Sequence, residues 1–193
     1  MSVSPLLDRL IQSLQVLPGV GPKSAQRMAL ALLQRHRPGA ARLAEDLAAA
    51  VEGIRECEIC RNLTEEPICR ICADERRDSA VLCVVESPAD IFAIEQAGGY
   101  TGVYFVLHGR LSPIDGIGPA ELQMERLQTR VRKDQTQEVI VATNATVEGE
   151  ATAHYIQELI GDNVRSVSRI AQGMPVGGEL EYADGHHSSR AAG

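Results

Sequence analysis

The stretch VLCVVESPAD, Val81 to Asp90, decides how the second half of this chain folds. An apolar run ends at Glu86, and Asp90 follows one helical turn later. Two carboxylates placed in this way look like half of a site for a divalent cation, which prefers oxygen ligands. The stretch therefore leaves two alternatives open: the active site of a nucleic-acid enzyme, or an acidic face kept for another use.

Four apolar, β-branched runs succeed one another from residue 80 onward, with helix-like segments between them. The runs are AVLCVVE (80–86), GVYFVL (102–107), EVIVAT (138–143) and VRSVSRIA (164–171). The helix-like segments lie near Ile91, between Ala120 and Lys133, and from Gly149 to Ile160. Continuous apolar strands that alternate with helices indicate a buried parallel sheet, so we expect an α/β fold here.

The first 54 residues have a helical pattern instead. Hydrophobic residues recur at helical spacing after Ser4-Pro5, and this helix should end before Pro18-Gly19. A second helix is expected from about Lys23 to Leu33 and a third from about Ala40 to Ile54, with a break at Pro38-Gly39.

The turn LPGVGPKSAQRMA, residues 17–29, predicts a contact with a phosphodiester backbone. Gly19 and Gly21 allow a tight turn, and the next helix presents its free N–H groups and positive dipole end at the same place. Lys23 and Arg27 lie four residues apart and therefore share one face of that helix. Such a site holds DNA without reading bases. The stretch resembles the hairpin of helix-hairpin-helix proteins; the alternative is a plain helix-turn-helix connection with glycine caps.

Charge divides the chain in the same way. Residues 1–44 carry six basic and one acidic side chain, a balance of +5, so a total of −7 leaves −12 on residues 45–193. A basic head on an acidic body suggests two functions in one chain.

The apolar runs are too short to span a bilayer, and residues 1–10 lack the pattern of a signal peptide. We therefore expect a cytoplasmic protein with reduced thiols and no membrane partner.

Four cysteines in CEICRNLTEEPICRIC, residues 57–72, predict a zinc site. Cys57, Cys60, Cys69 and Cys72 form two C-x2-C turns separated by eight residues, and each turn can direct two thiolates at one ion. With four protein ligands the site is closed, so we expect one structural Zn²⁺. The fifth cysteine, Cys83, lies in an apolar strand and is predicted to be a buried small hydrophobic residue.

A second acidic stretch, ATNATVEGEATA at residues 142–153, follows the third apolar run. It resembles the Toprim pattern of topoisomerases and primases, in which one strand ends in glutamate and a later strand ends in Asp-x-Asp before Glu-Gly-Glu. Glu86 matches the first glutamate and Glu148-Gly149-Glu150 the last motif, but Asn144 and Thr146 stand at the two aspartate positions. The loss of two carboxylates should greatly weaken Mg²⁺ binding.

These motifs, in this order, resemble the RecR family of bacterial recombination mediators over nearly the whole chain. The resemblance implies no catalytic residue, a ring-like clamp assembled as a tetramer or dimer, binding of single- and double-stranded DNA, and action with RecF and RecO in loading RecA on single strands. It implies that the helix-hairpin-helix end supplies DNA contacts and a subunit interface. It also implies that an acidic Toprim face docks RecO, and we assign to this acidic set Glu86, Asp90, Glu148 and Glu150.

The expected domains are residues 1–54 (helix-hairpin-helix), 55–78 (zinc finger), 79–172 (Toprim) and 173–193 (C-terminal assembly segment and polar tail). The tail GHHSSRAAG is short and polar, whereas the relatives that the chain resembles usually continue from Asp184-Gly185 into a Leu-rich last helix. Whether this lineage has lost that helix or the sequence ends differently stays open, so assembly through this end is in question.

Other polar residues have weaker signals. Arg126, Arg130, Arg132 and Lys133 are expected to form a solvated helix face. For His108, Arg110 and Asp115 two alternatives stay open: they face DNA or a partner, or they only shape a turn. Two rival functions remain open: a Toprim nuclease or primase-like enzyme with Mg²⁺ on the acidic set, and a zinc-stabilised DNA-binding module that acts alone.

Overall fold

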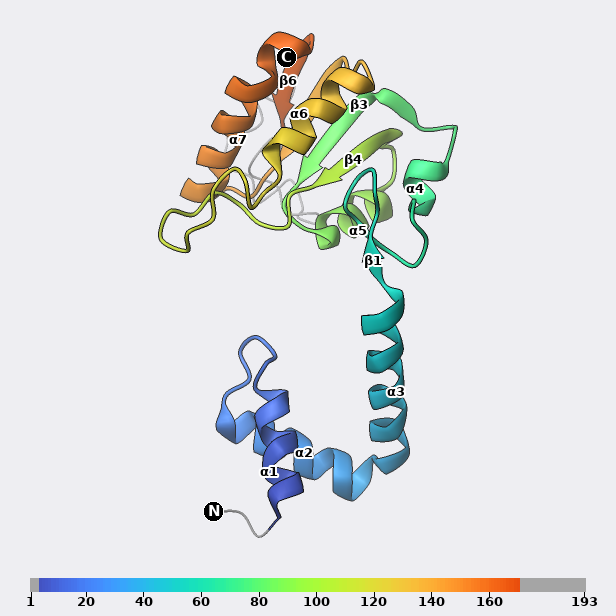
Figure 1. Cartoon of the computed structure of the whole chain (residues 1–193), viewed down its shortest axis with the longest axis vertical. Coiled ribbons are helices and arrows are strands. Elements are labelled where there is room, and N and C mark those ends of the chain that lie inside the picture. The colour runs from blue at the N-terminus through green and yellow to red at the C-terminus, as the bar shows by residue number, and fades with distance from the viewer. Residues whose placement is uncertain (1–3, 171–193) are drawn as a thin grey trace, which may run out of the picture. The chain divides into compact units, whose positions relative to one another are not determined.

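The computed structural model describes residues 4–170 (Figure 1), which form two compact units with the boundary between Ile54 and Arg55. The C-terminal assembly segment expected at residues 173–193 lies outside the described residues. Within residues 4–170, no helix is both long enough and apolar enough to cross a membrane.

Three helices make up the first unit: α1 (Pro5–Leu14), α2 (Pro22–Arg35) and α3 (Arg37–Gly53). Ser4 caps α1, because its hydroxyl accepts a hydrogen bond from the Leu7 N–H at 3.4 Å. α1 packs on α2, where Ala25 and Ala29 are fully buried. Small side chains at this contact let the two helix backbones approach closely.

The break between the second and third helices was predicted at Pro38-Gly39, and this position is wrong. The break is a single residue, His36, which ends α2 and precedes α3 with φ −134° and ψ 37°. Pro38 lies in the first turn of α3, where its missing N–H would have had no helical partner. Proline here starts a helix rather than stopping one.

The second unit is built on a four-stranded parallel sheet, as the sequence predicted. Its strands, in the spatial order β4-β3-β5-β6, are β4 (Gly102–Val106), β3 (Asp78–Val85), β5 (Glu138–Ala142) and β6 (Ser166–Arg169). Val85 at the end of β3 is level with Val106 of β4 and with Ala142 of β5. Glu86 and the loop after β5 are therefore brought to the same edge of the sheet.

Side chains of β3 alternate between the two faces of the sheet. Leu82 and Val84 pack under α6 (Met124–Lys133) and α7 (Val147–Ile160), which is followed by the short 3-10 helix η1 (Gly161–Asn163). Cys83 and Val85 pack on the opposite face with α5 (Pro88–Ala97). Cys83 is buried, as expected, and burial raises the pKa of its thiol to about 12.

The cysteine-rich segment belongs to the same compact unit as the sheet. It contains β1 (Arg55–Glu56), β2 (Leu63–Thr64) and the short helix α4 (Arg70–Ala73). β1 and β2 form a small antiparallel pair. Ile71 of α4 packs against the core on the α5 face of the sheet, so the segment shares hydrophobic core with the strands.

Candidate zinc site, DNA hairpin and acidic strand ends

The four predicted metal ligands meet at one point. The sulfur atoms of Cys57, Cys60, Cys69 and Cys72 all lie within 4.8 Å of one another, and the first three cysteines are buried. Tetrahedral zinc with Zn–S bonds of about 2.3 Å separates its sulfurs by about 3.8 Å, which this cluster accommodates. The set is closed and offers no position for substrate, so the zinc is structural.

The cysteine thiols are hydrogen-bonded to one another, and these bonds shift their pKa values. Cys60 Sγ and Cys69 Sγ are 3.5 Å apart, and hydrogen bonds from the Cys60 and Cys72 thiols lower the pKa of Cys69 to about 2. The same hydrogen bond to Cys69 raises the pKa of Cys60 to about 12. A bound Zn²⁺ would hold all four cysteines as thiolates, so its binding would release the thiol protons.

Residues 57–62, here called the first knuckle, have every backbone carbonyl hydrogen-bonded. Two bonds are internal, Arg61 N–H to Cys57 O and Cys57 N–H to Asn62 O. The other four donors come from the sheet and α6: Arg126 to Glu58 O, Arg130 to Ile59 O at 3.4 Å, Val106 N–H to Cys60 O at 2.9 Å, and His108 Nε2 to Arg61 O at 2.6 Å. The sheet unit therefore fixes half of the metal site.

Arg61 anchors this knuckle from within. Its buried guanidinium donates to the carbonyls of Val106, Leu107 and Leu122 at 3.1–3.2 Å and to a Glu56 carboxylate oxygen at 3.2 Å. A buried charge is tolerated when it is paired and hydrogen-bonded in this way. Arg61 was not predicted from the sequence, because the carbonyls that it binds lie 45 to 61 residues away and no local pattern marks them.

The hairpin site, defined by Gly19, Gly21, Lys23 and Arg27, lies wholly in the first unit. Gly19 has φ +75°, a conformation that favours glycine, and Gly21 is the N-cap of α2. No acidic residue lies in the first turn of α2. Lys23 and Arg27 are exposed and have no hydrogen bond or ion pair within the described residues, so both cations are available to a phosphate.

Glu86, in contrast, is turned into the protein. Only 6% of it is exposed, and its carboxylate accepts the Asn144 backbone N–H at 2.9 Å and the Asn144 side-chain amide at 2.7 Å. Arg110 lies 3.7 Å from the same carboxylate. The residue at the first Toprim glutamate position therefore holds the loop after β5 in place and offers little surface to a partner.

The other members of the acidic set have separate surroundings. Asp90 closes a capping box at the start of α5 by accepting the Ser87 N–H at 2.8 Å. Glu148 and Glu150 lie in the first turn of α7, and Glu150 forms an ion pair with Arg169. In the described part of the chain, the cysteines form the one group arranged to hold a metal, and these carboxylates do not.

The structure tests the predictions for the basic residues of α6 and for the loop after β4. The prediction that Arg130 lies on a solvated helix face is wrong: it is only 8% exposed, because α6 turns it toward the finger. Arg132 is exposed and bonds Asn163 Oδ1 at 3.0 Å. In the loop after β4, Asp115 bonds Ser112 at 2.6 Å, in agreement with a turn-shaping role.

A helical hairpin unit joined to a parallel sheet that carries a four-cysteine finger defines a class of zinc-containing, DNA-binding proteins built on the Toprim fold. Family models match the chain in this order: the RecR helix-hairpin-helix (7–51), the RecR four-cysteine zinc finger domain (54–74), the Toprim domain (80–171), and the RecR C-terminal model (173–186).

Curated relatives agree along nearly the full length. "Recombination protein RecR" of Saccharophagus degradans is 59% identical over 182 residues, which cover 94% of this chain and 92% of the relative. The proteins of that name from Xanthomonas oryzae and Xanthomonas campestris are each 58% identical over 191 residues, covering 99% of this chain and 97% of the relative. The chain belongs to the RecR family.

Proposed function

We propose that this chain is a non-catalytic recombination mediator of the cytoplasm, which binds single- and double-stranded DNA as a ring-like homo-oligomer. It acts with RecF and RecO in recombinational DNA repair and helps to load RecA on single strands. The observation that carries this proposal is the pair of hydrogen bonds from Asn144 to Glu86. They engage the carboxylate that a Toprim enzyme would need for its metal.

The rival function as a nuclease or primase-like enzyme needs carboxylate oxygens that converge on Mg²⁺. Glu86 is engaged by Asn144, and Asp90 by Ser87. Asn144 also carries N–H donors where an aspartate would supply oxygens. Incubation with DNA and Mg²⁺ or Mn²⁺ tests the rival, and metal-dependent turnover that Glu86→Gln abolishes would restore it.

The hairpin site is the DNA contact in this proposal. Lys23→Ala with Arg27→Ala should weaken binding to all DNA sequences alike and lower the salt slope by about one for each lost phosphate contact. The matched control is Arg35→Ala with Arg42→Ala, which removes two exposed charges from the same unit. Equal losses in both double variants, measured by fluorescence anisotropy at several salt concentrations, would show a diffuse charge effect and no specific hairpin contact.

RecO docks, in this proposal, on the more accessible members of the acidic set, Glu148 and Glu150, with Glu86 supporting the surface from beneath. An acidic patch attracts a basic partner most strongly at low salt. Glu148→Gln with Glu150→Gln should therefore weaken RecO binding, more at low than at high salt, and leave the zinc content unchanged. Glu158→Gln, two turns further along α7, is the control. Unaltered RecO affinity in the double variant would remove the docking role.

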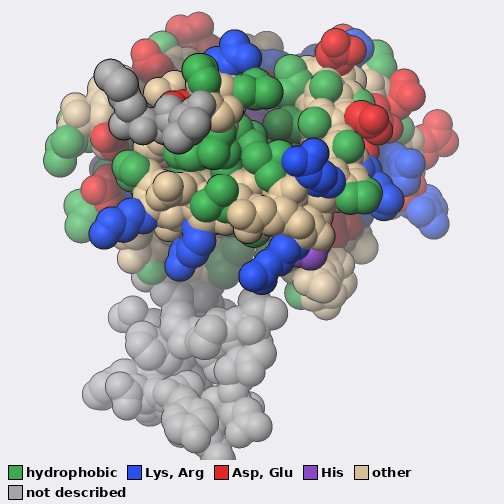
Figure 2. Space-filling model, turned by 90° about the horizontal axis from the view of Figure 1, so that it is seen from below, with side chains coloured by type: hydrophobic (Ala, Val, Ile, Leu, Met, Phe, Trp, Pro, Cys, Tyr) green, Lys and Arg blue, Asp and Glu red, His purple; other side chains and the backbone are tan. Residues whose placement is uncertain are grey.

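The first unit also has an apolar stripe that suits a subunit interface. Leu43, Leu47, Val51 and Ile54 recur on one side of α3 and its end, and each is 44–76% exposed. Figure 2 shows one face of the molecule, on which hydrophobic side chains are exposed among both basic and acidic ones. A second copy of the chain is the occupant that the proposed ring requires.

A further inference from the structure

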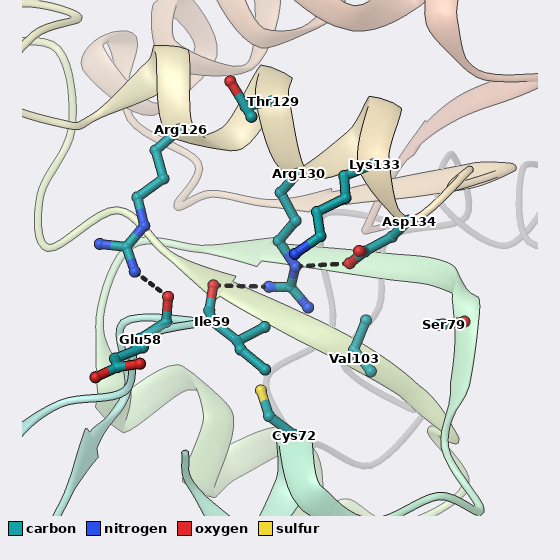
Figure 3. A pocket seen from close by; sticks show the side chains of 10 residues that line it. All are labelled: Glu58, Ile59, Cys72, Ser79, Val103, Arg126, Thr129, Arg130, Lys133 and Asp134. Atoms are coloured by element: carbon teal, nitrogen blue, oxygen red, sulfur yellow. Dashed lines mark hydrogen bonds and ion pairs between the residues drawn. The ribbon is translucent and has the colours of Figure 1, made fainter. Parts of the chain in front are cut away.

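A cavity of about 410 Å³ lies in the second unit between the zinc finger and α6 (Figure 3). Glu58, Ile59 and Cys72 line it on the finger side. Arg126, Arg130 and Lys133 line it from α6, four and three residues apart, so they share one face of the helix. We call this cavity the basic pocket.

Arg130 is the fixed wall of the basic pocket. Its guanidinium donates to the Tyr104 carbonyl of β4 and to the Ile59 carbonyl, and it pairs with Asp134 at 3.2 Å. With 8% exposure it cannot swing out to solvent without breaking all three contacts. The pocket is thus preorganised before any ligand arrives, which lowers the entropy cost of binding.

The two remaining cations are not neutralised. Arg126 donates to neutral acceptors, the Glu58 carbonyl and the Gln123 side chain. Lys133 has no hydrogen bond or ion pair in residues 4–170. Figure 3 shows the Glu58 carboxylate turned away from Arg126, and Asp134 is already paired with Arg130. Arg126 and Lys133 therefore carry positive charges that no carboxylate of the pocket pairs, in a unit that is acidic as a whole.

We propose that the basic pocket binds a phosphate group. A guanidinium and an ammonium beside a buried arginine match the charge and the several acceptor oxygens of phosphate. Ile59 and Val103 add apolar walls to the pocket. The phosphate belongs to a DNA backbone, in which case the inference rests on the proposed function, or to a free nucleotide.

The test uses Lys133→Gln, which breaks no contact of the described structure, and the double variant Arg126→Gln with Lys133→Gln. Arg132→Gln is the matched control, because it removes the same charge from the same helix but faces Asn163. Zinc content and the thermal midpoint report whether each variant is folded. One arm measures DNA affinity against salt, and the other measures stabilisation by inorganic phosphate and by a mononucleotide.

A DNA phosphate predicts that Lys133→Gln lowers the salt slope by about one and that Arg132→Gln does not. If the ligand is a free nucleotide, the salt slope of DNA binding should stay unchanged in Lys133→Gln. A mononucleotide should then no longer stabilise Lys133→Gln against heat, whereas it should still stabilise Arg132→Gln. The inference is overturned if both pocket variants match Arg132→Gln in both arms. It is also overturned if they lose zinc with both phosphate responses intact, since the cations would then only balance the thiolates. Stabilisation by a mononucleotide can still be measured when Lys23→Ala and Arg27→Ala are added. A wrong assignment of the hairpin as the DNA contact can therefore be distinguished from a wrong assignment of the pocket as a phosphate site.

Discussion

Gly149 is the residue on which the acidic edge of the sheet depends. A Cβ atom there would lie 2.1 Å from the Asn144 carbonyl oxygen and 3.2 Å from a Glu86 carboxylate oxygen. The Glu-Gly-Glu motif therefore needs its glycine for space, because α7 starts directly against the loop that Glu86 holds.

We expect Gly149→Ala to lower the free energy of unfolding by about 1–3 kcal/mol, since the backbone carbonyl must move to admit a methyl group. Urea denaturation measures the change. Gly161→Ala is the control, because nothing lies within 4 Å of its added methyl group. Equal stability of the two variants would contradict the close approach.

The sequence could predict residues whose chemistry is local. The four cysteines could be assigned to one metal site because the spacing of two C-x2-C turns is itself a specific signal. Glu86 could be placed at a strand end, but its burial depends on Asn144, 58 residues away. Arg130 was misjudged for the same reason: the carbonyls it binds lie 26 and 71 residues away. Long-range contacts of single side chains leave no periodic signal.

At the scale of elements, periodicity and punctuation predicted the helices and the parallel strands, because one buried face repeats along each of them. The order of the strands was not predictable, since it depends on which edges pair. The boundary at His36 was also missed, because proline permits a first helical turn as readily as it ends a helix.

The zinc finger divides into two halves with different support. The first knuckle is bonded to the sheet and α6 at four carbonyls. The stretch from Leu63 to Ala73 has no comparable set of carbonyl bonds to the sheet in the described structure; it is held by Ile71 in the core and by the bond from the Glu58 N–H to the Pro67 carbonyl at 2.9 Å. Metal removal should therefore release the second half first.

We expect Cys69→Ser to lose zinc and to speed hydrogen exchange in residues 63–73 by about tenfold or more, while residues 57–62 stay protected. Hydrogen exchange with mass spectrometry measures this difference. Cys83→Ala, which removes a thiol outside the cluster, should retain the metal. Uniform loss of protection across the whole finger would argue against a preformed first knuckle.

At the scale of the whole molecule, our proposal assigns assembly to the exposed stripe on α3. Each leucine covered in an interface contributes about 1.5–3 kcal/mol. Leu47→Ser with Val51→Ser should therefore shift the protein toward the single-chain mass of 20.8 kDa in light scattering. Leu63→Ser, on a similarly exposed leucine of the other unit, is the control. An unchanged mass for the double variant would place the interface elsewhere.

The fully bonded first knuckle also determines where this protein can be cut. A recombinant fragment beginning at residue 79 would leave Arg126, Arg130 and His108 without the finger carbonyls that they bind. It would also uncover the core against which Ile71 packs. A fragment beginning at Arg55 keeps all of these contacts. The finger should therefore not fold when it is transferred alone to another protein. Mutations that change the shape of the sheet beneath it should also change how tightly the finger retains its metal.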